Sequence, residues 1–205
     1  LDLAASTING TLTATGGATA GIVDSGNVAV AGNVTLTTDA GNGVINMGTL
    51  QQSAGDLILV TNGNGAATVV NNAAIDFGTS NVGGALDVTA SAGTITQNGG
   101  ALTVAGTSAF TTSTNDQAIT LSNTTNALTG AVAFTTGGTA GNVVIDNGTT
   151  GLDLAASTIN GTLTATGGAS AGIVDSGNVA VAGNVTLTRD AGNGVINMGT
   201  LQQSE

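Results

Sequence analysis

A near-identical internal repeat constrains this chain more than any other feature. Residues 1–53 recur at 152–204, an offset of 151, and the copies differ only at Thr19, which becomes Ser170, and Thr38, which becomes Arg189. Self-similarity at a fixed period is the signature of an array of stacked units. We therefore predict one continuous array over residues 1–205, with one long repeat unit at 1–151 and the start of a second copy at 152–205. We expect the natural protein to carry many such units.

A shorter pattern lies inside the long unit. Gly10 to Gly32 and Gly84 to Gly106 both span 22 residues, and their alignment places Leu12 with Leu86. Each segment contains a glycine, a short run that alternates apolar and polar residues, a small-residue turn and another run. This pattern predicts about 21–25 residues per turn and about six or seven turns in the long unit.

The apolar runs are typical of short strands. Thr11-Leu12-Thr13, Val34-Thr35-Leu36 and Ile119-Thr120-Leu121 alternate with a period of two, and glycine and asparagine separate such runs. An antiparallel sandwich and a parallel β-solenoid both accommodate short strands. The self-similarity favours the solenoid, in which equivalent residues of successive turns stack, and the crossover rule favours a right-handed coil. The predicted fold is all-β, a single continuous right-handed parallel β-helix.

The aromatic content predicts a thin core. The chain has no Trp or Tyr and only three phenylalanines, Phe77, Phe110 and Phe134. A core of Val, Leu, Ile and Ala suits a layered cross-section better than a thick sandwich. One turn of this length buries too little apolar surface to offset the ordering of its own chain. Each turn therefore depends on neighbouring repeats of the same chain.

Composition also excludes several functions. The formal charge is −11, and the chain lacks His, Cys and Lys, which serine triads, cysteine nucleophiles, Schiff-base enzymes and most zinc sites require. Arg189 alone cannot build a surface for nucleic acid. No apolar run approaches the ~18 residues of a membrane helix. We predict a protein that is not an enzyme, with no catalytic, cofactor or metal site, no nucleic-acid partner and no membrane insertion.

Asparagines beside glycine and in Asn-x-Thr sequons are candidate ligands or glycan acceptors. We favour a structural role for the Asn-Gly pairs, because asparagine tolerates positive φ in tight turns and its amides can stack into a ladder. The sequons fit glycosylation, but an Asn- and Thr-rich chain also produces them by chance. The pairs include those that begin at Asn9, Asn42, Asn62, Asn98 and Asn147, and the sequons include those at Asn9, Asn33, Asn123 and Asn147.

The acidic residues are a second candidate set. Calcium binding or glycosidic hydrolysis by paired carboxylates would need them clustered. The chain has no G-G-x-G-x-D motif, and one Arg is too few to grip an acidic sugar. We interpret the dispersed charge as a device that keeps an apolar-cored rod soluble. The dispersed residues are Asp24, Asp39, Asp56, Asp76, Asp87, Asp116 and Asp146, with Glu205 at the end of the chain.

Outward threonines suggest another function, the binding of ice or carbohydrate surfaces. Thr11-Leu12-Thr13 and Thr35-Leu36-Thr37 are the runs that suggest it. A flat recognition plane needs the same outward residues on every turn. The sequence alignment gives an interrupted array, with Asn33/Thr35/Thr37, then Ala85/Asp87/Thr89, then Ala131/Ala133/Thr135.

Three strings, STINGTLTATGG, GIVDSGNVAVAGNVTLT and ITQNGGALTVAGTSAFTT, resemble the repeat regions of filamentous haemagglutinin-like exoproteins of the two-partner secretion pathway. The resemblance covers essentially the whole chain and rests on composition and repeat grammar. It implies a right-handed β-helical shaft, export through an outer-membrane barrel, and a role in attachment or biofilm cohesion. The absence of cysteine suits a fibre that crosses the periplasm unfolded.

These observations predict a structural shaft or spacer of a large bacterial cell-surface adhesin or fibre, located outside the cell. A self-associating extracellular filament or sheath protein is one alternative, and an ice- or carbohydrate-binding solenoid that uses outward Thr and Asn is another. The expected partners are neighbouring repeats of the same chain, further copies in a fibre, and a host or matrix receptor that the sequence does not specify.

Overall fold

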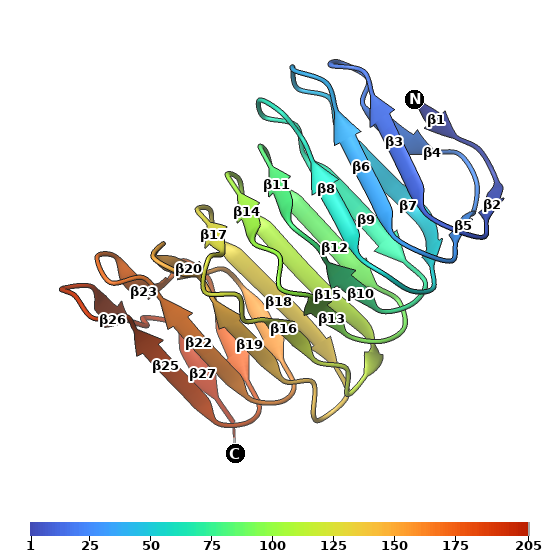
Figure 1. Ribbon diagram of the computed structural model, residues 1–205. Coiled ribbons are helices and arrows are strands. Elements are labelled where there is room, and N and C mark those ends of the chain that lie inside the picture. Colours follow the sequence, from blue (N-terminus) through green and yellow to red (C-terminus); the bar gives the residue numbers. More distant parts are fainter. Residues whose placement is uncertain (205) are drawn as a thin grey trace.

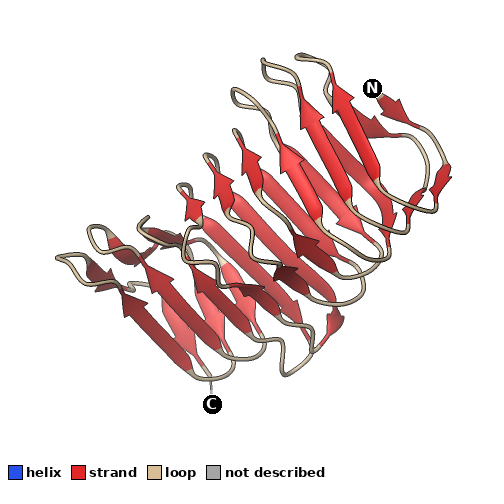
Figure 2. Cartoon of the chain, viewed as in Figure 1, coloured by secondary structure: helices blue, strands red, loops and turns tan. Residues whose placement is uncertain are grey.

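The computed structural model describes residues 1–204. Over this range the chain forms parallel strands and no helix, stacked into a solenoid of about 9 turns with about 22 residues per turn (Figure 1). The two termini lie at opposite ends of the stack, and loops line its edges (Figure 2). The predicted parallel β-solenoid is confirmed, while its right-handed sense stays a prediction.

Two parallel sheets enclose the core. We call the 15-stranded sheet A and the 12-stranded sheet B. The strands of sheet A are β1 (Asp2–Leu3), β2 (Ser6–Ile8), β4 (Ile22–Asp24), β5 (Val28–Val30), β7 (Ile45–Gln52), β9 (Ala67–Asn71), β12 (Leu86–Ala90), β15 (Ser108–Asn115), β18 (Val132–Gly137), β20 (Leu152–Leu154), β21 (Ser157–Ile159), β23 (Gly172–Asp175), β24 (Val179–Val181), β26 (Val195–Asn197) and β27 (Leu201–Gln203). The strands of sheet B are β3 (Leu12–Gly16), β6 (Val34–Thr38), β8 (Leu57–Val60), β10 (Ile75–Phe77), β11 (Ser80–Val82), β13 (Ile95–Gln97), β14 (Leu102–Val104), β16 (Ile119–Leu121), β17 (Ala127–Leu128), β19 (Val143–Asp146), β22 (Leu163–Gly167) and β25 (Val185–Arg189).

The period-two alternation places apolar side chains inside. In β6, Val34 and Leu36 are fully buried, whereas Thr35 and Thr37 between them lie on the outer surface. The register pairs Leu12 with Val34 and Val34 with Leu57, so inward residues of successive turns stack. Neighbouring turns are about 4.8 Å apart, the spacing of paired strands. The core is therefore one continuous column that runs the length of the stack.

One full turn through both sheets is called a coil here. The strand order defines coil 1 (β1–β3), coil 2 (β4–β6), coil 3 (β7, β8), coil 4 (β9–β11), coil 5 (β12–β14), coil 6 (β15–β17), coil 7 (β18, β19), coil 8 (β20–β22) and coil 9 (β23–β25), and β26 and β27 begin a tenth. Because β1, β2 and β3 recur as β20, β21 and β22, the 151-residue offset corresponds to seven coils. This agrees with the sequence prediction of six or seven turns.

The sheets fork at three places along the stack. β7 pairs with both β4 and β5 on one side, and β18 pairs with both β20 and β21. In sheet B, β8 pairs with both β10 and β11. Sheet A is therefore split into two short strands in coils 1, 2, 8 and 9, and sheet B is split in coils 4 to 6.

The sheet to which each strand belongs corrects one expectation from the sequence, namely that the aligned residues of Gly10–Gly32 and Gly84–Gly106 stack on one face. Both segments contain a five-residue strand followed by two three-residue strands, as the alignment implies. However, Leu12 begins β3 in sheet B, whereas Leu86 begins β12 in sheet A. The two segments are related by about three and a half coils, so their aligned residues lie on opposite sheets and do not stack.

Buried polar side chains repeat with the same half-turn relation. Asn71 Oδ1 accepts from Gln52 N at 2.7 Å and its Nδ2 donates to Gln52 O at 3.0 Å. Asn147, 76 positions further on, makes the same pair of bonds to Leu128 at 2.8 and 3.0 Å. Asn71 ends β9 in sheet A and Asn147 follows β19 in sheet B. One long repeat therefore consists of two halves that share their core design and begin on opposite faces.

The three phenylalanines stack inside the middle coils. Phe110 and Phe134 are register partners on β15 and β18, with ring centroids 5.8 Å apart and planes at 20°. Phe77 meets Phe110 edge to face at 6.3 Å. All three side chains are fully buried, and such contacts add to the stability that burial alone provides.

Candidate functional site

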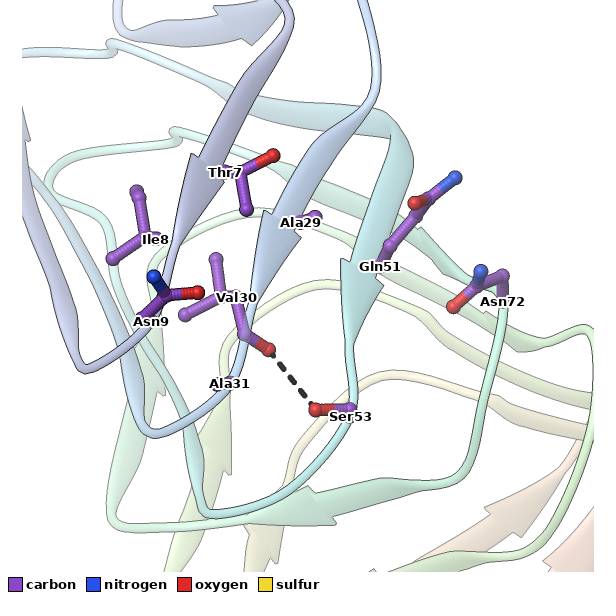
Figure 3. Close-up of a pocket in the computed structure, with 9 residues that line it drawn as sticks. All are labelled: Thr7, Ile8, Asn9, Ala29, Val30, Ala31, Gln51, Ser53 and Asn72. Carbon is purple, nitrogen blue, oxygen red and sulfur yellow. Dashed lines mark hydrogen bonds between the residues drawn. The ribbon is translucent and has the colours of Figure 1, made fainter.

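A hollow on the outer surface of sheet A is the first candidate site. It has a volume of about 300 Å³ and lies across coils 1 to 4. Thr7, Ala29 and Gln51 sit side by side on β2, β5 and β7, and they are register partners (Figure 3). Across the hollow from this row, Ser53 Oγ donates to Val30 O at 3.5 Å. The lining residues are Thr7, Ile8, Asn9, Ala29, Val30, Ala31, Gln51, Ser53 and Asn72.

The concavity comes from the small side chains of coil 2. Ala29 and Ala31 form the floor, whereas coil 1 carries Thr7 and Asn9 and coil 3 carries Gln51. A second hollow of about 210 Å³ adjoins the first, because it shares Gln51 and Asn72 and extends to Ser91 in the loop that follows β12. Together the two hollows form a groove along the stack from coil 1 to coil 5, which we call the sheet A groove.

The second copy of the repeat carries the same hollow. Its volume is about 180 Å³, and its lining residues are Thr158, Ile159, Asn160, Ala180, Val181, Ala182, Gln202, Gln203 and Ser204. Apart from Gln203, each lies 151 positions after a lining residue of the first hollow. Of the residues that line the first hollow, the sequence reasoning singled out only Asn9, as an Asn-Gly pair and a sequon. It did not predict a hollow, because the hollow depends on which residues become neighbours in the register.

A third hollow, of about 310 Å³, surrounds Asp153. It is lined by Thr129, Thr150, Gly151, Leu152, Asp153, Ala171, Gly172 and Val174. The Oδ1 atom of Asp153 is buried there and has no hydrogen-bond partner among residues 1–204. In the described part of the chain no group of three or more acidic residues is placed to hold a metal ion, so this carboxylate stands alone.

The aspartates often join one coil to the next. Asp24 accepts hydrogen bonds from Gly48 N at 2.8 Å and from Thr49 N at 2.7 Å, at the fork in β7. Asp175 makes the same contacts with Gly199 and Thr200 in the second copy. The interpretation of the dispersed aspartates as a solubility device therefore misses a structural role. The sequence signal for that role is a Gly-Thr pair that begins 24 residues after the aspartate, as in Asp24 with Gly48 and Asp175 with Gly199.

Two of these carboxylates have a lowered pKa. The N–H groups of Thr139 and Ala140 donate to Asp116 Oδ1 at 2.7 and 2.8 Å and hold the pKa of that carboxyl below its ordinary value. At Asp175, burial raises the pKa, but the N–H groups of Thr200 and Gly199 outweigh it and the pKa ends below its ordinary value. Hydrogen bonds to a carboxylate favour its charged form.

The Asn-Gly pairs are turns, but not in the predicted way. The positive φ falls on the glycine at Gly63, Gly99 and Gly148, and among residues 1–204 only Asp116 adopts it without being glycine. Nor do like amides stack into a ladder. Asn62 Nδ2, for example, donates to Thr38 O at 2.6 Å. The amides of Asn42, Asn62 and Asn147 bond to the backbone of a neighbouring coil, whereas Asn98 Nδ2 donates to Asp56 Oδ1 at 3.2 Å.

The sequons at Asn9, Asn33, Asn123 and Asn147 differ in exposure. Asn9 and Asn33 are exposed and Asn123 is half-buried. Asn147 is fully buried, and its amide is held by Leu128 and Gly151. A glycan on Asn147 is therefore incompatible with the folded coil.

The threonine array is arranged differently from the sequence alignment. Thr37 lies on sheet B, whereas its aligned partners Thr89 and Thr135 lie on sheet A, so the three aligned runs do not share one face. The register instead stacks four outward threonines on sheet A, namely Thr89, Thr111, Thr135 and Thr158. The adjacent column holds Asp87, Ala109 and Ala133. On sheet B, Thr13 and Thr15 of β3 pair with Thr35 and Thr37 of β6, and the second copy repeats this patch. Ile58 and Val60 end the patch on the next coil, so no threonine plane runs the length of the stack.

The comparison with known families gives a match over most of the chain. The family described as "Repeats of unknown function (DUF5649)" matches residues 63–135 and 140–201, together more than half of the chain. The chain belongs to this family. The two DUF5649 segments begin 77 residues apart, close to half of the 151-residue offset. One DUF5649 repeat therefore corresponds to about three and a half coils, and consecutive repeats begin on opposite sheets.

Comparison with curated proteins and comparison with solved structures give no match to this DUF5649 chain. Within residues 1–204 there is no helix with the length and apolar character needed to cross a membrane.

Proposed function

We propose that the chain is part of the shaft of a large bacterial cell-surface adhesin or fibre. It acts outside the cell as a non-enzymatic spacer that carries a binding region elsewhere, and it serves attachment or biofilm cohesion. One observation supports this most directly: residues 151 apart take the same strand and the same face seven coils further along. Each unit therefore adds length without turning the faces of the shaft.

The packing supports the same proposal. The core column and the two ladders continue along the stack, so each coil is stabilised by the coils on either side of it. The resemblance to filamentous haemagglutinin-like exoproteins supports the adhesin setting and the bacterial surface. Neighbouring repeats of the same chain are the partners that we propose for each coil.

Self-association is the second candidate. Val195 and Ile196 in β26 are 60% and 44% exposed, whereas Ile45, the counterpart of Ile196 in the first copy, is 1% exposed. In the first copy β9 of the next coil covers Ile45, so a coil buries its apolar residues only when another coil pairs with it. Sedimentation of the 205-residue chain at physiological salt tests self-association, since a monomer at all concentrations contradicts the filament.

The spacer proposal predicts what a deletion does in the full-length surface protein. Removal of one 151-residue unit should shorten the fibre by about 34 Å, which is seven coils of about 4.8 Å, and leave binding at the tip unchanged. Electron microscopy measures the length and a cell-adhesion assay measures the binding. As a control, Thr13→Ala, an exposed change outside the sheet A groove, should alter neither. Loss of adhesion in that variant, with normal length and folding, would contradict the spacer.

A further inference from the structure

The sheet A groove has a floor and walls of different chemistry. The methyl groups of Ala29 and Ala31 form its apolar floor, and hydroxyl and amide groups of coils 1, 3 and 4 surround it (Figure 3). No charged residue lines the groove, although the chain as a whole carries a charge of −11. An apolar floor with a few polar groups around it is the usual composition of a small-molecule site.

The polar groups of the wall are free to bind. The side chains of Thr7, Gln51 and Asn72 make no hydrogen bond within residues 1–204. Hydroxyls and amides both donate and accept, so they complement a ligand that is rich in hydroxyls. The lining has no cationic side chain to bind an anionic ligand and no carboxylate to bind a cationic one. The chemistry that fits is a neutral sugar, whose CH face covers an apolar floor while its hydroxyls meet the rim.

The shape of the groove selects a chain of sugars. The groove crosses coils 1 to 5, a length of about 19 Å for four steps of about 4.8 Å, and one step is close to the length of one sugar residue. We propose that the sheet A groove binds a linear neutral oligosaccharide, with the hydroxyls of successive sugars paired to successive coils.

The recurrence of the hollow supports a binding role. In the second copy the preceding coil fixes the wall, because Asn160 Nδ2 donates to Thr136 O at 2.6 Å and Asn160 N donates to Thr136 Oγ1 at 3.0 Å. This leaves Asn160 Oδ1 free to accept. The fold does not require the hollow, because the half-repeat has Thr103 where the floor has Ala29. The sites thus recur every seven coils on one side of the shaft, an arrangement that raises avidity for a surface with many glycan chains.

Titration of the 205-residue chain with neutral hexasaccharides tests the proposal. The probes are the hexamers of β-1,4-glucan, α-1,4-glucan and β-1,4-mannan, and the readout is the shift of backbone amide signals in NMR spectra. We expect at least one hexamer to shift the amides of the lining residues in both copies saturably, with a Kd of about 1 mM. The absence of shifts with all three hexamers, or shifts confined to other residues, would overturn the proposal.

Matched variants locate the site. Ala29→Gln together with Ala180→Gln fills both floors and should weaken binding at least tenfold, whereas Ala109→Gln, also outward on sheet A but outside the groove, should leave it unchanged. Equal binding by all variants overturns the site. Equal or tighter binding of a galacturonate hexamer, or of an uncharged hexapeptide, overturns the ligand class. The spacer proposal is independent of these outcomes, since it rests on length.

Discussion

At the scale of single residues, two buried serines show what the core demands of a polar group. Ser80 Oγ accepts from Leu59 N at 3.1 Å and donates to Gly78 O at 3.0 Å. Ser108 is 3% exposed, yet its hydroxyl has no partner within residues 1–204. A buried hydroxyl without a partner costs free energy that a methyl group does not.

We therefore predict opposite effects for two serine-to-alanine changes. Ser108→Ala should raise the free energy of unfolding by about 1 kcal/mol, because it removes an unpaired polar atom. Ser80→Ala should lower it by about 1–2 kcal/mol, because it leaves Leu59 N without an acceptor. Urea unfolding followed by circular dichroism measures both. A destabilised Ser108→Ala would mean that its hydroxyl is satisfied in solution.

The lowered pKa of Asp116 predicts a dependence of stability on pH. A carboxyl with a folded pKa below its unfolded value stabilises the fold fully above the unfolded pKa, and this contribution is lost as the pH falls through the folded pKa. Asp116 and Asp175 both have this sign, so stability should decline below about pH 4.

Asp116→Asn isolates the contribution of that residue. Asparagine tolerates the φ of 63° at this position, and its oxygen can still accept from Thr139 and Ala140. The variant should lose part of the acid dependence while it keeps the fold at neutral pH. Melting temperatures between pH 2 and pH 7 measure the effect, and curves of equal slope for both proteins would show that Asp116 contributes nothing to it.

At the scale of elements, the two copies place the same strand in different surroundings. β6 and β25 differ only at Thr38 and Arg189, but Leu36 in β6 is fully buried and Leu187 in β25 is half-buried, since no coil with a sheet B strand follows β25 within residues 1–204. Leu36→Ala should cost about 2–5 kcal/mol, and Leu187→Ala clearly less. Hydrogen exchange at β6 and β25 measures the local cost. Equal costs would show that stacking on a following coil adds little to a strand.

The positions of the strands could be predicted from the sequence, but the sheet to which each strand belongs could not. Period-two alternation placed Val34 and Leu36 inside, and the glycines marked the turns. The pattern is the same whether a run begins on sheet A or on sheet B, because both faces need only inward apolar residues. Leu12 and Leu86 therefore aligned in sequence while lying on opposite sheets.

The candidate groove was out of reach of sequence reasoning for a related reason. Nothing local marks Ala29 as the floor of a site. It becomes one because the register places Thr7 on one side of it and Gln51 on the other, 22 residues away in each direction. The buried Asn147 shows the same limit, since its sequon reads like that of the exposed Asn9.

At the scale of the whole molecule, the half-turn relation sets a rule for how the array can change length. A complete unit of 151 residues is seven coils and keeps every downstream face in place. A single DUF5649 repeat of about three and a half coils should turn all downstream coils by half a turn. Deletion of residues 87–163 tests this, because it joins Leu86 to Thr164 at equivalent positions of the two halves.

In that deletion variant β22 should take the place of β12 and move from sheet B to sheet A. Thr164 would then lie beside Thr68 on β9, where Asp87 lies in the intact chain. The chain has no cysteine, so Thr68→Cys with Thr164→Cys reports the pairing, at a strand spacing of about 4.8 Å that a disulfide can bridge. We expect this disulfide in the deletion variant and not in the full chain, where the two residues lie on opposite sheets. Asp76→Cys with Thr164→Cys is the competing pair, since Asp76 lies outward on β10, the sheet B strand with which the first sheet B strand of the next coil pairs. If that pair forms the disulfide instead, β22 has stayed on sheet B. The sheet on which a downstream strand lies would then not depend on how many half-repeats precede it.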